Sequence, residues 1–341
     1  MHRRAFLAGT AALAATASLP RRAEAQAAYT MKLATVAPEG TPWADGLAQF
    51  KKSAEAATGG KLAVKVFMGG ILGDENETVQ QTQRGQIQGV GASTGAIASL
   101  VPELNILELP YLFRTAAEAD HVLDGPALAT LEKAFRDRGL QLGFWSENGY
   151  RSFGTTFGFI KSPADLKGHK MRSQENPVHI AMYTAFGASP VPIPTTEVLT
   201  SLQTGVIDGY DNTPLYASAA QWLSSTKYFT LTNHIYQPAA IVLNKTWFDG
   251  LPADIQRVII TTRTDLAVRM RKEIRALHPI LVSNFTAMKV QTYTPNATEL
   301  ASFEAPAKSA RDSYIGKASA GEKALYKLVT DALAKYRAGG N

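Results

Sequence analysis

Two spacings of apolar residues recur along this chain. Short apolar runs bounded by Gly, Pro, Asn and Asp predict strands, and segments with apolar residues every three or four positions predict helices. Strands that alternate with helices in this way are typical of an α/β protein. The predicted strands are 31–36, 62–67, 88–91, 140–145, 170–172, 206–207 and 239–243, and the predicted helices are 42–57, 75–84, 116–138, 178–186 and 196–203.

The longest helical pattern starts near Pro252 and continues past Leu281. Pro279 lies inside it, so we expect a kink or a break at that point. A helix of this length is more than one small domain needs, and it is long enough to lie across two. The apolar positions that define the pattern are Ile255, Ile259, Leu266, Met270, Ile274, Leu277 and Leu281.

The N-terminus has the pattern of a twin-arginine export signal. Arg3-Arg4 precedes a stretch rich in Ala and Leu that ends at Leu19, and Ala23-Glu24-Ala25 matches a cleavage site. The apolar stretch spans fifteen residues, which is short for a membrane-crossing helix, so a retained anchor is the weaker alternative. The chain has no Cys for lipid attachment. We therefore predict that residues 1–25 are a removed signal and that the protein is exported to the periplasm.

Removing residues 1–25 leaves 316 of the 341 residues, a length that suits two domains rather than one. The absence of Cys excludes disulfides, thiolate metal sites and cysteine nucleophiles. The formal net charge is +6, and about half of it lies in the signal. Positive charge is too evenly spread for a nucleic-acid surface, although a mildly basic protein is suited to handling anions.

The segment from Ser162 to Asn212 has the features of an anion site. Arg172 ends a short predicted strand, and Asn212 follows forty residues later. An arginine is suited to a carboxylate in a dry cleft, because its planar fork donates two parallel hydrogen bonds and keeps its proton. Asn176-Pro177 reads as a helix N-cap followed by a proline, so we expect helix N–H groups to point toward the same anion. The alternative is a surface arginine paired with a nearby acid.

Gly91-Ala92-Ser93-Thr94-Gly95 matches the G-x-S-x-G turn of serine hydrolases and follows a predicted strand. Only two predicted strands precede it, and no oxyanion segment is recognisable. No histidine of the chain after the signal (His121, His169, His179, His234, His278) stands in a triad setting. The simpler interpretation is that Ser93 and Thr94 present polar groups at the carboxyl end of a strand, where open α/β sheets bind ligands.

The remaining motifs are weaker evidence for a function. Gly89, Gly91 and Gly95 resemble a dinucleotide fingerprint with the third glycine misplaced by one, and no Walker A, H-E-x-x-H or EF-hand pattern occurs. Asp208 and Asp211 are close enough to ligate a cation, but turn formation is the commoner use of such aspartates. Several aromatic residues fall at predicted strand ends or loops and are candidate ligand contacts: Trp43, Trp145, Tyr150, Phe153, Tyr210 and Tyr236.

Taken in order, the segments of this chain resemble the solute-binding proteins of tripartite ATP-independent periplasmic (TRAP) transporters, of the dicarboxylate-binding type. The resemblance covers most of the chain after the signal. Each motif alone is weak, whereas their order and spacing together are specific. The segments that carry the resemblance are Thr58-Gly59-Gly60-Lys61-Leu62, Gly69-Gly70-Ile71-Leu72-Gly73-Asp74-Glu75, Gly85 to Ser93-Thr94, Glu108-Leu109-Pro110-Tyr111-Leu112-Phe113, Gly149-Tyr150-Arg151, Ser162-Pro163-Ala164-Asp165-Leu166-Lys167-Gly168 to Arg172, and Gly205-Val206-Ile207-Asp208-Gly209.

The resemblance implies a periplasmic-binding-protein fold of type II, the Venus-flytrap arrangement. Two α/β domains are joined by crossing strands, and a long helix lies over both. We expect residues 28–148 plus 238–278 to form domain I, and residues 149–237 plus 279–335 to form domain II.

The resemblance also implies the roles of several residues. Arg172 would form a salt bridge with the ligand carboxylate, Arg151 would add a second cationic contact, and Asn212 would hydrogen-bond the same group. One subgroup, which binds 2-oxoacids with a cation, has a Glu-Trp pair where this sequence has Asp211-Asn212, so we expect no metal. The full set of candidate ligand contacts is Arg172, Arg151, Asn212, Ser93, Thr94, Trp43, Glu39, Tyr236 and Asp211.

The function implied is capture of a small organic carboxylate in an interdomain cleft that closes on it, followed by delivery to the small and large TRAP membrane subunits. We expect a monomer without a cofactor, a nucleic-acid partner or enzymatic activity. Two alternatives stay open: an exported serine hydrolase that uses Ser93, and a binding protein of an ABC transporter or a sensor. The sequence leaves the ligand open between a C4-dicarboxylate and a small aromatic acid.

Overall fold

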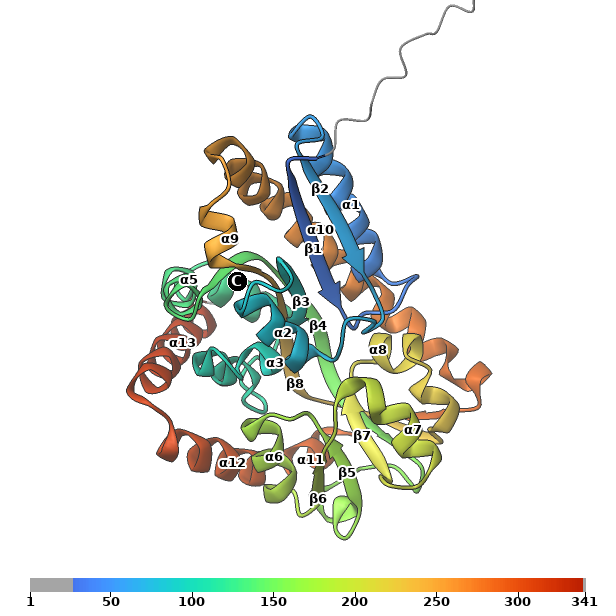
Figure 1. The fold of residues 1–341 in the computed structure, drawn as a ribbon. Helices are drawn as coiled ribbons and strands as arrows, with labels where there is room; N and C mark the ends of the chain where they lie inside the picture. Colours follow the sequence, from blue (N-terminus) through green and yellow to red (C-terminus); the bar gives the residue numbers. More distant parts are fainter. Residues whose placement is uncertain (1–26, 340–341) are drawn as a thin grey trace, which may run out of the picture.

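The computed structural model describes residues 27–339. Within that range nine strands form one mixed sheet in the order β2-β1-β3-β8-β4-β7-β5-β6, with β9 beside β8 (Figure 1). Strands β1, β2 and β3 are mutually parallel at one end of the sheet, and β5, β6 and β7 are parallel at the other. The strands are β1 (Tyr29–Thr35), β2 (Leu62–Phe67), β3 (Gly89–Ser93), β4 (Leu140–Thr155), β5 (Lys170–Ser173), β6 (Ser189–Pro192), β7 (Gly209–Asn212), β8 (Tyr228–Asn244) and β9 (Gln291–Tyr293).

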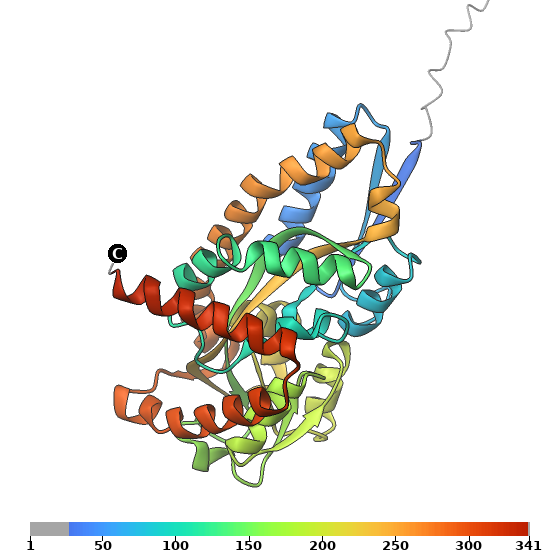
Figure 2. The same cartoon turned by 90° about the vertical axis from the view of Figure 1, so that its left-hand side faces the viewer.

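Helices cover both faces of this sheet (Figures 1 and 2). The α-helices are α1 (Pro42–Ala57), α2 (Glu75–Gln83), α3 (Thr94–Ile97), α4 (Ala116–Leu123), α5 (Leu128–Asp137), α6 (Pro177–Ala185), α7 (Val198–Gln203), α8 (Pro214–Ala219), α9 (Lys245–Asp249), α10 (Ala253–Asn284), α11 (Ala297–Ala301), α12 (Glu304–Lys317) and α13 (Ala320–Ala338). Short 3₁₀ helices are η1 (Pro102–Glu108), η2 (Pro163–Leu166), η3 (Thr195–Glu197), η4 (Trp222–Ser225) and η5 (Phe285–Met288).

Two long strands join the ends of the sheet. β4 and β8 pair antiparallel along nearly their whole length and run through the middle of the molecule (Figure 1). Successive side chains of a strand face opposite sides. Ile241 and Leu243 therefore pack into a core with α1 and α10, whereas Ala240 and Val242 pack into a second core with α4, α5 and α13. Two helical layers thus bury both faces of the crossing strands.

The cores divide the molecule into two lobes. The first lobe comprises β1–β3 with α1–α5, α13 and most of α10, and it contains the two cores just described. The second lobe comprises β5–β7 with α6–α8 and α12, and it contains two further cores. The long helix α10 contacts both lobes, because Ile255 to Ile274 pack in the first and Leu281 packs in the second. The predicted two-domain fold with a spanning helix is confirmed.

Local patterns predicted several elements closely and missed others. The bounds predicted for α1 and β2 are those observed. The helix predicted over 116–138 is two helices, since the chain turns at Gly125-Pro126 and a residue that precedes proline disfavours the α conformation. The strand predicted at 206–207 lies at Gly209–Asn212 instead. Helix α10 continues through Pro279 without the break that we considered.

The packing of α13 bears on the predicted domain division. That division places residues up to 335 in domain II. In the structure Leu325, Val329 and Leu333 of α13 pack in a first-lobe core, whereas Phe303 and Ala307 pack against the second-lobe helix α6. The C-terminal segment therefore returns to the first lobe after α12.

Candidate functional site

A polar cavity lies between the lobes, at the carboxyl ends of their parallel strands. Thr35 and Gly91 line it from the first lobe, and Arg172 and Asn212 line it from the second. This edge is where open α/β sheets place their ligands. The space between its lining residues amounts to about 450 Å³, part of it open to solvent. The full lining is Thr35, Val36, Ala37, Trp43, Glu75, Gly91, Ala92, Asn148, Arg151, Arg172, Gln174, Thr195, Asn212, Tyr216 and Gln237.

Arg172 brings a buried positive charge to this cavity. Its side chain is 1% exposed. Nε donates to the carbonyl of Ile193 (2.9 Å) and Nη2 donates to Thr195 Oγ1 (3.1 Å), which holds the guanidinium in place. Among the described residues no carboxylate lies within ion-pair distance, and Nη1 has no hydrogen-bond acceptor. Burial, and then the neighbouring charge of Arg151, lower the pKa of Arg172 from its ordinary value. The charges of Asp211 and Asp74 act on Arg172 from a distance, but no carboxylate of the described residues contacts it, so the cavity contains a buried cation without a direct acidic partner.

Arg151 lines the same cavity but is fully engaged by the protein. Its Nε donates to Asp211 Oδ2 (2.5 Å), its Nη1 donates to Gln237 Oε1 (2.9 Å), and its Nη2 donates to the Asp211 carbonyl (2.5 Å). Burial opposes the charge of Asp211, yet Arg151 and the hydrogen bond from His234 hold the pKa of this carboxyl well below its usual value. Tyr183 also donates to Asp211 (2.8 Å). Asp211 thus lies behind Arg151 as its counterion and does not line the cavity.

Asn212 and Trp43, two of the candidate ligand contacts, also line the cavity. Asn212 Oδ1 accepts from the backbone N–H of Thr213 (2.7 Å), so its amide group is oriented by its own turn. Within the described part of the chain Asn212 Nδ2 has no acceptor, which leaves an N–H donor for a ligand. Trp43 Nε1 donates to the carbonyl of Glu147 (3.1 Å), so its indole ring is the part available to the cavity.

Ser93 and Thr94 contact the cavity only through other residues. Ser93 donates from its backbone N–H to Glu75 Oε1 (2.7 Å) and from its hydroxyl to Glu75 Oε2 (2.9 Å). Gln174 Nε2 donates to the Ser93 hydroxyl (2.7 Å). Glu75 and Gln174, which the sequence reasoning missed, are the side chains that reach the cavity from this cluster.

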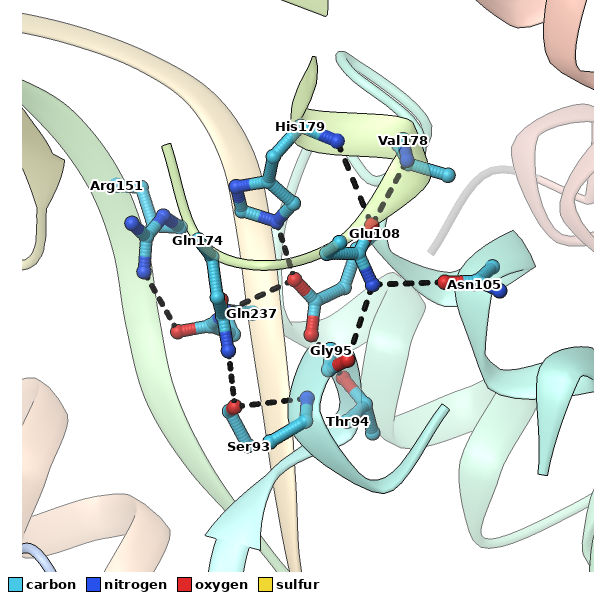
Figure 3. A network of polar contacts seen from close by, with 12 residues as sticks. Ser93, Thr94, Gly95, Asn105, Glu108, Arg151, Gln174, Val178, His179 and Gln237 are labelled. Atoms are coloured by element: carbon cyan, nitrogen blue, oxygen red, sulfur yellow. Dashed lines mark hydrogen bonds and ion pairs between the residues drawn. The ribbon is translucent and has the colours of Figure 1, made fainter. Parts of the chain in front are cut away.

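A buried polar seam joins the lobes beside the cavity (Figure 3). Glu108 of the first lobe accepts from Thr94 Oγ1 (2.6 Å) and from Gln237 Nε2 (2.8 Å), and it lies 2.6 Å from Nε2 of the second-lobe His179. Burial would raise the pKa of Glu108, but these donors, His179 foremost, lower it. Gly95 is required here, because a Cβ would lie 2.9 Å from both Glu108 carboxylate oxygens. The glycine of the G-x-S-x-G pattern therefore permits close packing.

The N-terminus of α6 belongs to this seam and not to the anion site that we expected. Asn176 accepts from the backbone N–H groups of Val178 (2.8 Å) and His179 (3.4 Å), which satisfies the donors we had assigned to a ligand. Its Nδ2 crosses to the first lobe and donates to Asn105 Oδ1 (2.7 Å) and the Gly95 carbonyl (3.0 Å). Neither Asn176 nor Pro177 lines the cavity.

Further contacts cross the mouth of the cavity. Thr196 donates its backbone N–H to Asp74 Oδ1 (3.2 Å), and Asn76 Nδ2 donates to Glu175 Oε2 (3.0 Å). Tyr216 donates its hydroxyl to the carbonyl of Val36 (3.3 Å). Each pair joins one lobe to the other, so the structure is a closed form.

Two of the candidate contacts lie elsewhere. Tyr236 is buried and donates its hydroxyl to Glu147 Oε2 (2.5 Å), beside Arg275 of α10. Glu39 is exposed in the loop after β1 and does not line the cavity. Asn148 and Gln237, which do line it, sit on the crossing strands, where no motif marked them in the sequence.

The hydrolase alternative finds no support in this geometry. The hydrogen bonds of Ser93 go to Glu75, Gln174 and Ala96, and none of them involves a histidine. A chain of Thr232, His234 and Asp211 does exist (2.8 and 3.4 Å), but these side chains are buried and do not line the cavity.

Two lobes, crossing strands and a closed polar cavity between them define a ligand-binding protein of the Venus-flytrap type. Between residues 27 and 339 no helix combines the length and apolar character needed to cross a membrane.

Comparisons with known proteins identify the family. A family model described as bacterial extracellular solute-binding protein, family 7, matches residues 33–317. A solute-binding protein of Verminephrobacter eiseniae is 40% identical over 238 residues, which is 70% of this chain and 71% of that protein. The C4-dicarboxylate-binding periplasmic protein of Rhodobacter capsulatus is 32% identical over 272 residues, which is 78% of this chain and 80% of that protein. A solved TRAP periplasmic solute-binding protein of Citrobacter koseri, with bound D-glucuronate, has a TM-score of 0.82 and 30% identity, covering 89% of this chain and 99% of its own.

The chain belongs to this family, the solute-binding proteins of TRAP transporters. Members of the family are binding proteins that capture a small ligand outside the cytoplasm and work with TRAP membrane components.

Proposed function

We propose that this protein captures a small organic acid anion and that Arg172 binds the ligand carboxylate. The observation that carries the proposal is the buried guanidinium of Arg172, which faces the cavity with no carboxylate partner among the described residues. A ligand carboxylate supplies the missing charge and accepts from the unused Nη1. Asn212 offers a second donor from the neighbouring strand, since Arg172 and Tyr210 are paired across β5 and β7.

The comparisons support an organic acid as the ligand. One relative is named for C4-dicarboxylates, and a solved relative holds D-glucuronate, so an anionic carboxylate is common to both. In the proposed site Arg172, Asn212 and Trp43 contact the ligand directly. Arg151 orients the site through Asp211, and Ser93 and Thr94 act through Glu75 and Glu108.

Closure of the lobes is the proposed consequence of binding. A ligand that touches both lobes stabilises the closed form through contacts that an open form lacks. The closed form would then be recognised by the small and large TRAP membrane subunits, which take up the ligand. A radius of gyration that shrinks on ligand addition, measured by small-angle X-ray scattering, is the expected result, and an unchanged scattering profile at saturating ligand contradicts closure.

We further propose that the protein acts as a monomer without enzymatic activity, cofactor or nucleic-acid partner, and that its domains follow the predicted division except for α13. The predicted twin-arginine signal comprises residues 1–25, which lie outside the described residues. If it directs export, replacing both Arg3 and Arg4 by Lys leaves the protein in the cytoplasm, whereas a normal periplasmic yield excludes this route.

Titration calorimetry of Arg172→Ala against an organic acid that binds the parent tests the site. Loss of one partner of a buried, hydrogen-bonded charge pair costs about 2–5 kcal/mol, because the ligand carboxylate is left unpaired. The dissociation constant should therefore rise roughly thirty-fold to several-thousand-fold. Arg269→Ala, on the outer part of α10, is a matched control and should bind as the parent does. If Arg172→Ala binds within about threefold of the parent, the carboxylate site lies elsewhere.

A further inference from the structure

Glu75 places a carboxyl group in the cavity that is proposed to bind an anion. It is the first residue of α2 and is 7% exposed. Its recorded hydrogen-bond partners are Ser93 and Gln174, and no cation among the described residues lies within ion-pair distance of it. A buried acid without a cationic partner is costly, so this residue needs an explanation beyond packing.

Ser93 holds Glu75 as a hydrogen-bond acceptor. The Ser93 hydroxyl accepts from Gln174 Nε2 (2.7 Å) and from the backbone N–H of Ala96 (3.2 Å), so its single proton is directed to Glu75 Oε2 (2.9 Å). The Ser93 backbone N–H occupies the other carboxyl oxygen (2.7 Å). Gln174 Nε2 also donates to Oε2 (3.4 Å). Each oxygen of a carboxylate accepts two hydrogen bonds, so one acceptor site remains for a ligand, on Oε1.

The cavity thus has two different polar ends, contributed by different lobes. Among the described residues, Arg172 of the second lobe offers a cation without a contacting carboxylate, and Glu75 of the first offers an acceptor without a contacting cation. Charged groups near Glu75 do not cancel this difference. Asp74 and Glu108 are acids, and both raise the pKa of Glu75, which burial raises most, to about 7.

We infer that Glu75 selects the ligand class: it accepts hydrogen bonds from ligand hydroxyl groups and excludes a second carboxylate, so that the ligand is a hydroxylated monocarboxylate. This inference rests on the proposed function, in which Arg172 takes the one carboxylate. A dicarboxylate bound at Arg172 would bring its second charge toward the buried carboxyl group of Glu75, and like charges repel strongly where burial lowers the effective dielectric constant. A hydroxyl group in the same place donates to Glu75 instead.

The rest of the lining fits a hydroxylated chain or ring. Its polar members, apart from the two arginines and Glu75, are neutral groups that donate or accept single hydrogen bonds. They come from both lobes and from the crossing strands. The amide of Gln237 is already satisfied by the protein, so the others are the partners available to ligand hydroxyl groups. The neutral polar residues of the lining are Thr35, Asn148, Gln174, Thr195, Asn212, Tyr216 and Gln237.

Calorimetry at pH 8, where Glu75 is largely ionised, tests the inference with two panels of ligands. One panel contains hydroxylated monocarboxylates (D-glucuronate, D-gluconate, D-galactonate), and the other contains dicarboxylates (succinate, L-malate, glutarate). We expect the best hydroxylated monocarboxylate to bind the parent at least about a hundredfold more tightly than any dicarboxylate, because a site built to bond a hydroxyl rejects a ligand that leaves its polar group unpaired.

Glu75→Gln keeps the size of the side chain and removes the charge. We expect it to weaken hydroxylated-acid binding by about tenfold or more and to strengthen dicarboxylate binding. The selectivity ratio, defined as the affinity for the best hydroxylated acid divided by that for the best dicarboxylate, should therefore fall. Ser93→Ala removes the hydroxyl group that donates to Glu75 and should also lower the selectivity ratio. This second variant keeps the test informative if Glu75→Gln folds poorly. Glu77→Gln, on the exposed side of the same helix, is the matched control and should keep the parental ratio.

The outcomes separate the two proposals. A dicarboxylate that binds the parent as tightly as the best hydroxylated acid, or a selectivity ratio that neither Glu75→Gln nor Ser93→Ala changes, overturns the role of Glu75 and leaves the organic-acid function intact. Absence of binding by every member of both panels, or binding that survives Arg172→Ala, overturns the proposed function and the inference with it.

Discussion

Arg151 and Arg172 line the same cavity, are equally buried and differ in what surrounds them. Arg151 lies on the long strand β4, where β7 and β8 flank it, and every donor nitrogen of its guanidinium reaches an acceptor of the protein. Arg172 lies next to the last residue of the short strand β5 and is held by one carbonyl and one hydroxyl. The first arginine is paired within the closed molecule, whereas the second has no carboxylate of the described chain in contact with it.

The difference shows how one residue type supports two tasks. In an ion pair such as Arg151–Asp211 each charge neutralises the other without a ligand. Loss of either partner leaves the other as an uncompensated buried charge. An arginine without a counterion is a cost in the empty protein and a source of affinity in the complex. Stability measurements should therefore identify Arg151, and binding measurements should identify Arg172.

The largest expected effect is the loss of stability in Arg151→Ala. Asp211 would remain buried without its arginine, with Tyr183, His234 and the more distant His179 as partners, which should lower the free energy of unfolding by about 3–5 kcal/mol. Urea denaturation of the ligand-free protein measures this. Arg172→Ala is the control and should be at least as stable as the parent. Equal destabilisation by both substitutions would mean that the two environments do not differ as described.

The acids of the two environments should respond to pH in opposite directions. Burial, followed by the charge of Asp74, raises the pKa of Glu75 from 4.5 to about 7. Ionisation of Glu75 therefore destabilises the folded state as the pH rises above about 4.5, and this loss of stability is complete above about 7. The shift corresponds to roughly 3 kcal/mol. The pKa of Asp211 is instead held low, so its contribution is present above its ordinary value of 3.8 and is lost only in strong acid.

Denaturation of the parent and of Glu75→Gln between pH 5 and pH 8 checks the Glu75 half of this contrast. The variant should gain stability relative to the parent across that interval, while Glu77→Gln should follow the parent. A constant difference between parent and Glu75→Gln over the interval would show that Glu75 does not titrate there.

Arg172→Lys sharpens the comparison by keeping the charge and removing the fork. An ammonium group supplies no bidentate geometry, so ligand affinity should fall about ten- to a hundredfold, or roughly 1.4–2.8 kcal/mol. Arg151→Lys should mainly reduce stability, because Lys cannot reach Asp211 and Gln237 together. Calorimetry and denaturation of both variants decide the matter, and affinities unchanged in Arg172→Lys would mean that the carboxylate is bound by charge alone.

The smallest effect concerns the contact of Asp74 across the cavity mouth. Asp74 is the N-cap residue of α2 but makes no side-chain capping bond, and instead it accepts from Thr196 in the other lobe. Asp74→Ala should weaken the closed form by about 1 kcal/mol, the usual net value of a hydrogen bond. Stopped-flow measurement should show ligand release a few-fold faster. Asp165→Ala, which removes a capping interaction far from the cavity, should leave release unchanged.

Short-range patterns along the sequence were sufficient for much of the fold. Thr41, Pro42 and the apolar spacing that follows define α1, and Asn176-Pro177 defines the start of α6, because caps and periodicity act within one or two turns. The same reasoning selected Arg172 and Asn212 as candidates, and both line the cavity, although their place on neighbouring strands came only from the structure. The break at Gly125-Pro126 was also readable in principle, since its cause is local.

Only the tertiary structure decided which polar groups stay unpaired. Asp211 lies sixty residues from Arg151 in the chain, and Ser93 lies eighteen residues from Glu75. No local pattern therefore reveals that Arg151 and Asp211 neutralise each other, or that Ser93 leaves Glu75 as an acceptor at the cavity. Local sequence specifies helices and strands because their hydrogen bonds and apolar faces repeat over a few residues. The free donors and acceptors of the cavity are what remain after distant segments have satisfied one another, and that remainder exists only once the lobes are packed.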